Sequence, residues 1–347
     1  MTTVSVIIKA FNEEQHIAGA IESAIAALNG FSGEVILADS GSTDKTVAIA
    51  SQYPVRVVQL SRRKDRSCGV GPQLGYQHSC GEYVCLIDGD MILDYDFIGA
   101  AIAFLRTHPR AGGVSGLVTD INLENLEFKR RVIRPLQSLK AGVVDCLAGG
   151  GLYRRSAIQA VGYFSDRNLH AYEELELAER LRRAGWTLHR LGRRFVDHYG
   201  HSIGSYHLLW RRLKTHYVLG IGELLRSALF RPHFRQTVRD VPELWLWLAV
   251  TVCWLCLPIV ALLIDNSWTF AFVVVLLVAL AIAVMSTRYR SLSVGVYSVM
   301  AWNAFSFGLV YGFLRPRIEP TKWIDSRIVH DMGKPSKNAR YGETQCV

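Results

Sequence analysis

Short runs of aliphatic and β-branched residues alternate with segments of helical spacing along residues 4–205. The runs VSVIIKAF, EVILAD, VRVVQL and YVCLID predict strands, and EEQHIAGAIESAIAAL, TDKTVAIASQY and GPQLGYQHSC between them predict helices. Strands that alternate with helices in this way are typical of an α/β fold, in which a mostly parallel sheet carries helices on both faces. Ligands bind such a sheet beyond the carboxyl ends of its strands.

The pattern changes at Leu244, where long apolar runs begin. Residues 244–264 and 268–285 contain no charged residue, and each run is long enough to cross a bilayer as a helix. A third run, 292–314, is weaker because it contains Asn303 and several serines. It is expected either to span the membrane or to form a re-entrant or interfacial segment.

The segment that precedes these apolar runs, residues 205–240, is rich in basic residues. The chain has a net charge of +9, and residues 205–240 contain seven Lys or Arg against two acids. Basic residues beside a membrane span favour the cytoplasmic face and anionic headgroups. A nucleic-acid surface is the alternative, which the adjoining spans disfavour, so no nucleic-acid partner is expected. The N-terminus lacks the pattern of a secretory signal, and the α/β part is therefore expected in the cytoplasm.

Together these patterns divide the chain into four predicted parts. They are an α/β domain at 1–205, basic amphipathic membrane-proximal helices at 206–243, two to three transmembrane or re-entrant helices at 244–314, and a polar tail at 315–347. The chain shows no internal repeat and no low-complexity tract. Its seven cysteines are odd in number and lack the spacing of a disulfide framework, which predicts reduced thiols.

Polar side chains follow three of the predicted strands. The motif Asp88-Gly-Asp90 directly follows the run YVCLI, and Asn12-Glu13 and Asp39 follow two others. Two converging carboxylates with few further ligands suit a hard divalent cation that keeps positions open for phosphate oxygens. The alternative for the motif is a turn whose aspartate caps the next helix, and for Asp39 it is an Asx turn.

Five stretches carry a family resemblance. SVIIKAFNEEQHI, ILADSGSTDKT, CGEYVCLIDGDMIL, GGGLYRRSAIQAVGYF and YEELELAERLRRAGW come in the order seen in family-2 inverting glycosyltransferases, which the chain resembles over roughly residues 4–205. The resemblance implies the Rossmann-like GT-A fold, a UDP- or GDP-sugar donor, and Mg²⁺ or Mn²⁺ as cofactor. It further implies a bacterial inner-membrane enzyme of polysaccharide or glycolipid biosynthesis, with its catalytic domain in the cytoplasm.

The same resemblance implies roles for individual residues. Glu174 is expected to deprotonate the acceptor hydroxyl as the catalytic base. The expected metal ligands are Asp88, Asp90 and His198, and His201 competes with His198 for that role. The expected substrate contacts are Asp39 at the nucleobase, together with Asn12, Glu13, Asp88, Gly150, Gly151 and Glu173.

Helical spacing agrees with the assignment of the base. Glu174 lies three, four and seven positions before the apolar residues of its predicted helix, and so continues their inward face. Partial desolvation there would raise its pKa toward the working range of a general base. Glu176 and Glu179 are instead expected to face outward and to pair with arginines four positions on. The alternative is that these glutamates only offset the helix dipole.

Other function classes fit the pattern less well. The first strand ends in KAFNEE rather than G-x-G-x-x-G, which disfavours a dinucleotide oxidoreductase. A haloacid-type phosphatase would carry its D-x-D on the first strand. Pro72-Gln73 replaces an Arg-Asn pair that is common in the family, and the Q-x-x-R-W signature of processive synthases is absent. We therefore expect transfer of one sugar to a lipid-linked acceptor, of polyprenyl type. The alternatives are a polyprenyl-phosphate sugar synthase and a non-catalytic nucleotide-sugar sensor or transporter.

Overall fold

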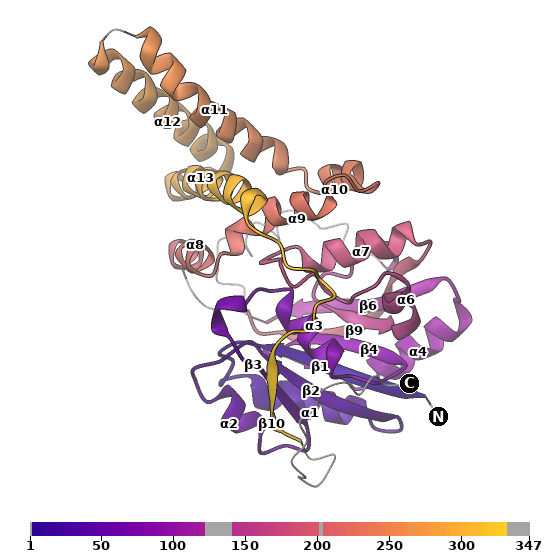
Figure 1. The fold of residues 1–347 in the computed structure, drawn as a ribbon. Coiled ribbons are helices and arrows are strands. Elements are labelled where there is room, and N and C mark those ends of the chain that lie inside the picture. The colour runs from indigo at the N-terminus through magenta and orange to yellow at the C-terminus, as the bar shows by residue number, and fades with distance from the viewer. Residues whose placement is uncertain (1, 122–140, 201–203, 265, 332–347) are drawn as a thin grey trace.

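A central sheet organises the N-terminal two thirds of the chain. The structure is a computed structural model, and it describes residues 2–121, 141–200, 204–264 and 266–331. Within these residues one sheet has the strand order β10-β3-β2-β1-β4-β8-β6-β9-β5, with β7 paired to β9 (Figure 1). Helices cover both faces of the sheet, as the alternating pattern predicts.

The first half of the sheet is parallel. It consists of β1 (Thr3–Ala10), β2 (Ser32–Asp39), β3 (Arg56–Leu60) and β4 (Tyr83–Asp88). The helices α1 (Ile17–Ala27), α2 (Thr46–Ala50) and α3 (Val70–Gln77) connect these strands. The carboxyl ends of the four strands therefore share one edge, where the sequence places its polar clusters.

The second half of the sheet is mixed. It contains β5 (Met91–Leu93), β6 (Ala111–Asp120), β7 (Gly142–Val144), β8 (Gly151–Arg154) and β9 (Thr187–His198), with helices α4 (Phe97–Thr107), α6 (Arg155–Ala160) and α7 (Glu173–Arg183). β8 runs antiparallel to β4 and β6, and β5 runs antiparallel to β9. The α/β fold class is confirmed, with the parallel part confined mainly to the N-terminal half.

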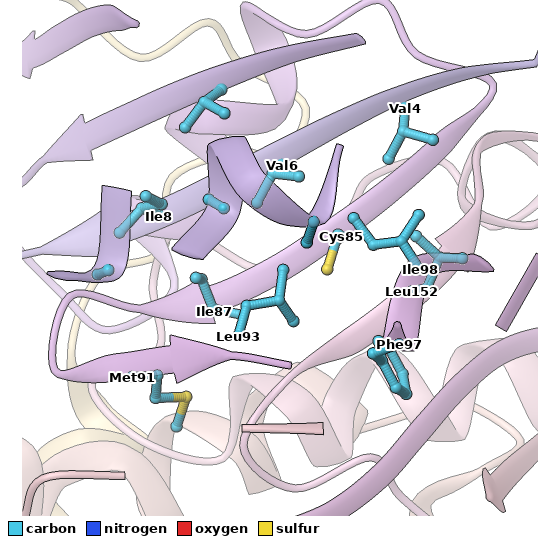
Figure 2. Packing of buried hydrophobic residues seen from close by; sticks show 14 of the residues in the cluster. Val4, Val6, Ile8, Cys85, Ile87, Met91, Leu93, Phe97, Ile98 and Leu152 are labelled. Atoms are coloured by element: carbon cyan, nitrogen blue, oxygen red, sulfur yellow. The ribbon is translucent and has the colours of Figure 1, made fainter. Parts of the chain in front are cut away.

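Side chains of the central strand β1 point alternately to the two faces of the sheet and are buried on both. Val4, Val6 and Ile8 of β1 pack on the side of α1 and α4, with Phe97 and Leu152 (Figure 2). The intervening Ile7 faces the other side, toward α3 and α7. Successive side chains of a strand point to opposite faces, so a strand buried on both sides reads as an unbroken apolar run.

The predicted apolar runs form three long helices. They are α11 (Leu244–Leu263), α12 (Ser267–Tyr289) and α13 (Leu292–Leu314), each long and apolar enough to cross a membrane. Only 6% of the apolar window of α11 and of α12 is buried, against 33% for α13. α11 and α12 project away from the α/β domain, and α13 lies at the junction (Figure 1).

Shorter helices join the α/β domain to the long ones. They are α8 (Ser205–Lys214), the 3₁₀ turn η3 (Tyr217–Leu219), α9 (Gly220–Ala228) and α10 (Phe234–Asp240). Another 3₁₀ turn, η1 (Arg63–Asp65), lies within the α/β domain between β3 and α3. α13 packs closely on α9: a Cβ placed on Gly222 of α9 would lie 2.1 Å from the Leu309 carbonyl oxygen of α13. This contact fixes α13 against the α/β domain.

The segment predicted as a polar tail contributes a strand to the sheet. β10 (Ser326–His330) pairs antiparallel with β3 and forms one edge of the sheet. Ahead of it, Arg167 donates hydrogen bonds to the carbonyl oxygens of Lys322 and Trp323. Residues before β10 therefore cross the α/β domain to reach its far edge (Figure 1).

Most of the described cysteines are free thiols, as the sequence predicts. They are Cys68, Cys85, Cys146, Cys253 and Cys256. Cys80 is disulfide-bonded, so the prediction of reduced thiols is wrong at that position.

Candidate active site

A cavity of about 350 Å³ opens at the carboxyl ends of β1 and β4. That volume lies within the range of small-molecule sites, about 300–1,000 Å³. The end of β1, the D-G-D turn and the segment after η1 form one wall, and α8 and η3 form the other. Its charged lining residues are Lys9, Glu13, Arg66, Asp88, Asp90, Arg211 and Arg212.

Lys9 is the cation that stabilises Asp88. Its Nζ lies 3.2 Å from Oδ1 of Asp88 and 3.2 Å from Oε1 of Glu173. Although burial acts to lower the pKa of Lys9, the charges of Asp88 and Glu173 hold that pKa well above its usual value. Lys9 therefore remains charged and ties the end of β4 to the start of α7.

His198 stabilises the second aspartate of the motif. The antiparallel pairing of β5 with β9 places His198 opposite Met91, beside Asp90. Its Nε2 lies 3.5 Å from Oδ2 of Asp90, and its Nδ1 lies 2.7 Å from Oδ1 of Asp120. The hydrogen bond to Asp90 is the largest influence on the His198 ring and raises its pKa to about 9. A protonated His198 thus balances the charge of Asp90.

Glu13 adds a third carboxyl group to the same wall. Asn12, with φ of +58°, turns the chain at the end of β1, and its Oδ1 accepts a hydrogen bond of 2.8 Å from the backbone NH of Thr43. This turn directs Glu13 into the cavity. Burial, and next the charge of Asp90, raise the pKa of Glu13 to about 8. Ionisation of Glu13 beside Asp90 is therefore unfavourable unless a cation enters the cavity.

The carboxylates suit a divalent cation of the Mg²⁺ type. Among the described residues no group of three or more His, Cys, Asp or Glu side chains is arranged to hold a metal on its own. Mg²⁺ is commonly held by one or two carboxylates, with its other positions filled by water and substrate phosphates. Asp88 and Asp90 offer two such carboxylates on a cavity wall. They fit a cation whose remaining ligands arrive with a phosphorylated substrate.

Asp39 lies below the cavity surface. It is fully buried at the end of β2, and its carboxylate accepts hydrogen bonds from the backbone NH groups of Gly41 and Ser42 and from Nε2 of Gln59. These bonds form the Asx turn that the sequence offers as an alternative, and they fix the loop that carries Ser40 to the cavity wall. A contact between Asp39 and a nucleobase stays a prediction.

Glu174 lies at the start of α7, beside the glycine loop. Both of its carboxylate oxygens accept from the backbone NH of Gly149, at 3.1 and 3.2 Å. Burial raises the pKa of Glu174 to about 7, against the opposing charge of Lys9 and with the support of Glu173. Glu174 does not line the cavity. Its neighbour Glu173 contacts Lys9, which does line the cavity. The role of Glu174 as the base stays a prediction.

The glycine loop passes close to the end of β4. Gly150 has φ of +92°, and a Cβ placed there would lie 2.2 Å from the carbonyl oxygen of Leu86. Gly151 follows at φ of +153° and begins β8. Only glycine fits both the backbone conformation and this close approach, which brings Gly149 within hydrogen-bond distance of Glu174.

The prediction that Glu176 and Glu179 face solvent is wrong. Glu176 does pair with Arg180, at 2.8 Å, but the two side chains are only 3% and 7% exposed. Glu179 is completely buried and accepts a hydrogen bond from Thr237 of α10 rather than pairing with an arginine. Glu176 is covered by the segment after α6, where Tyr163 donates a hydrogen bond to it, and Glu179 is covered by α10.

Sequence reasoning missed the basic side chains of the cavity. Lys9 could have been found, since a lysine inside a β-branched run fits only where the strand meets a polar edge. Arg66 stacks on Phe11, with its guanidinium 3.6 Å from the ring centre, and donates to the carbonyl oxygens of Ser40 and Gly41. Arg211 and Arg212 of α8 were assigned to the membrane surface, yet they line the cavity.

Comparison with known proteins agrees with this geometry. Residues 5–162 match the family described as Glycosyl transferase family 2. A putative glycosyltransferase of Bacillus subtilis, EpsE, is 30% identical over 187 residues, which cover 50% of this chain and 64% of that protein. A dolichyl-phosphate β-glucosyltransferase of Trichomonas vaginalis is 26% identical over 159 residues, which cover 42% of this chain and 48% of that protein. The matched region thus spans about half to two thirds of the length of these curated relatives.

A solved structure shares the fold. A mannosyltransferase from Pyrobaculum calidifontis, in complex with GDP-mannose and Mn²⁺, aligns with a TM-score of 0.55 over 90% of this chain and 86% of that chain. Its sequence identity is 19%. The alignment extends beyond residues 5–162 and includes part of the C-terminal helical region.

Proposed function

We propose that the chain, whose residues 5–162 match the glycosyltransferase family 2 model, is a glycosyltransferase of GT-A fold that transfers one sugar from a nucleotide-sugar to a lipid-linked acceptor at the membrane. The observation that carries the proposal is the cavity beside Asp88 and Asp90, whose opposite wall is the basic helix next to the apolar helices. One site thus combines acidic groups for a metal, basic groups for a diphosphate and proximity to lipid.

The donor diphosphate is proposed to lie between the two walls. Asp88 and Asp90 would hold Mg²⁺ or Mn²⁺, which supplies positive charge to the departing diphosphate. Arg211 and Arg212 approach the same space from α8, and Arg66 approaches from the segment after η1. Guanidinium groups form paired hydrogen bonds with phosphate oxygens, so these arginines would orient the diphosphate and stabilise the charge that develops on it.

Glu174 is proposed to act as the general base. Its pKa of about 7 places the carboxyl group where it is partly ionised at neutral pH and can accept a proton from an acceptor hydroxyl. Direct attack of that hydroxyl opposite the leaving group inverts the anomeric centre. Lys9 would hold Glu173 and α7 in place while the proton moves.

A lipid-linked acceptor is supported by the C-terminal helices and by one relative. Three helices are long and apolar enough to cross a membrane, and the Trichomonas protein is named for transfer to dolichyl phosphate. Seven Lys or Arg in residues 205–240 support a cytoplasmic face for the catalytic domain, at the inner membrane of a bacterial cell.

The test is a donor screen with the full-length protein in lipid nanodiscs. UDP- and GDP-sugars are supplied with Mn²⁺, with and without a polyprenyl-linked saccharide, and the released nucleoside diphosphate and the glycosylated lipid are both measured. We expect one donor to be consumed, with faster release when acceptor lipid is present. Binding of a nucleotide-sugar without transfer to any lipid or sugar would instead indicate a sensor, and no binding of any donor would refute the proposal.

A further inference from the structure

A second cavity lies beside the active site, where the α/β domain meets α9 and α13. Its volume is about 80 Å³, several times the roughly 10–15 Å³ that one water molecule needs. Six cationic side chains line it, against two acids. The cations are Lys64, Arg66, Arg167, Arg226, Arg315 and Arg317, and the acids are Asp65 and Glu223.

Two of the six cations are neutralised by acids. Arg315 lies 2.9 Å from Oε1 of Glu223, and Arg317 pairs with the fully buried Asp166. Asp65, the other acid of the lining, pairs at 2.8 Å with Arg62, which lies outside the cavity. Acidic groups therefore account for only a minority of the positive charge.

The remaining arginines bond to neutral main-chain oxygens. Arg226 donates to the carbonyl of Phe313 at 2.8 Å, Arg167 to that of Lys322 at 2.9 Å, and Arg66 to that of Ser40 at 2.8 Å. Carbonyl oxygens fix the direction of a guanidinium group without cancelling its charge. Lys64 is exposed and also lines the cavity. Four positive charges thus converge without an acidic partner among the lining residues.

Converging cations are unfavourable without a counter-charge, and their arrangement suits a phosphate. Arginine and lysine around a small polar cavity provide many donors to one anion. The carbonyl bonds hold three of these side chains in place, so little side-chain entropy is lost when an anion enters. The cavity has room for one phosphate group.

The cavity lies between an exposed apolar face of α13 and the active site. Phe307, Tyr311 and Leu314 of α13 are 62%, 53% and 68% exposed and follow one another at helical spacing toward Arg315. On its other side the cavity shares Arg66, Ser67 and His170 with the active-site cavity. A molecule that enters along α13 would meet the basic cavity first and the reaction centre next.

We propose that this basic cavity binds the phosphate of a lipid-linked saccharide, with the lipid along the exposed face of α13 and the saccharide in the active-site cavity. The inference rests on the proposed glycosyl transfer and specifies its acceptor. The nucleophile is a sugar hydroxyl, and the lipid phosphate serves only to bind and position the acceptor. A polyprenyl phosphate that is itself glycosylated would need its phosphate at the reaction centre instead.

The test varies two residues of the cavity outside the proposed catalytic set. Lys64→Glu and Arg226→Gln are compared with Arg110→Glu, a matched change at an exposed site at the opposite end of β6 from Asp120. Full-length proteins in phosphatidylcholine nanodiscs are assayed for transfer to a polyprenyl diphosphate-linked hexose and for donor hydrolysis without lipid. Circular dichroism checks that each variant is folded.

The expected result is a change in acceptor KM alone. Loss of one charged contact to a phosphate should raise KM for the lipid acceptor by about tenfold in each cavity variant, with kcat and donor hydrolysis unchanged. Arg110→Glu should leave all three unchanged. Added inorganic phosphate should compete with the lipid in the wild type. Equal KM in wild type and both cavity variants would overturn the proposal, as would transfer to polyprenyl phosphate that carries no sugar.

Two further outcomes separate this inference from the proposed function. If no lipid is glycosylated, co-sedimentation with vesicles that carry the polyprenyl diphosphate-linked hexose still measures binding. Weaker binding by Lys64→Glu and Arg226→Gln than by wild type would then support the cavity while refuting the transfer. If vesicles of phosphatidylglycerol compete as well as the saccharide lipid, the cavity binds an ordinary phospholipid headgroup and the proposed acceptor is wrong.

Discussion

Replacing Glu174 by Gln tests the base most directly. The glutamine keeps the shape of the side chain and an oxygen that can accept from the NH of Gly149, which in the wild type lies 3.1 Å from Oε1. It removes only the ability to take a proton. The loss of a general base typically costs about 10²–10⁴ in rate, so transfer should fall by about a hundredfold or more. Donor affinity should be nearly unchanged, because the donor is expected on the Asp88 side.

The pH dependence of kcat/KM tests the role of Glu174 as the base in a second way. With a pKa of about 7, Glu174 is ionised in about one molecule in eleven at pH 6 and in about ten of eleven at pH 8. The basic form is the active one. The value of kcat/KM should therefore rise about tenfold between these pH values in the wild type. The Gln variant should lack this rise.

Glu173→Gln is the matched control, because it removes the same charge one residue away. The charge of Glu173 raises the pKa of Glu174, so its removal should lower that pKa and move the acid limb of the profile to lower pH. Transfer should persist at a lower rate, because the change also removes the ion pair of Glu173 with Lys9. Initial rates are measured from about pH 5.5 to about pH 9, a range that brackets the pKa of Glu174. Donor binding is measured by calorimetry on the same samples. If the Gln variant at 174 keeps wild-type transfer, or if the anomeric configuration of the donor is retained, the base and the inverting mechanism are wrong.

Three other predictions concern the metal, the fold of α7 and the glycine loop. Asp90→Ala should abolish transfer, and excess chelator should do the same to the wild type until Mn²⁺ is restored; full activity in chelator would contradict the metal site. Glu176→Ala should destabilise the fold by about 3–5 kcal/mol in thermal unfolding, because it leaves the 7%-exposed Arg180 without its partner; unchanged stability would contradict the buried ion pair. Gly150→Ala should destabilise clearly more than Gly162→Ala, since both have φ above +90° but only the first would place a Cβ against a main-chain carbonyl; equal losses would refute the clash.

The sequence predicts the fold class and the polar edge because both depend on local pattern. Strand runs that end in polar residues determine where β1, β2 and β4 deliver their side chains. The D-G-D motif therefore could be placed at the carboxyl edge of the sheet, and the cavity lies there. The helical spacing within α7 likewise predicts that Glu174 faces the interior, where burial raises its pKa.

The remaining features depend on contacts between segments far apart in the chain. Glu179 reads as an outward residue of an amphipathic helix, and only the packing of α10, with Thr237, makes it buried. Arg211 reads as a membrane-surface residue, and only the position of α8 turns it toward the cavity. Nothing in the local pattern of residues 326–330 shows that they pair with β3, because edge pairing depends on which strand is left uncovered.

The pairing of β10 with β3 also fixes the parity of membrane crossings. Strands of one sheet lie on the same side of a membrane, so the chain between them crosses an even number of times, and the three apolar helices cannot all cross. α13 is the one with a third of its window buried, and it packs on α9, so we predict that α11 and α12 form the crossing pair. Arg288 and Arg290, at the end of α12, then return to the side of the catalytic domain, as expected for a cytoplasmic face. Cysteines placed at Asn266 and Arg290 should accordingly be labelled from opposite sides of the membrane, and labelling from one side would refute the two-crossing topology.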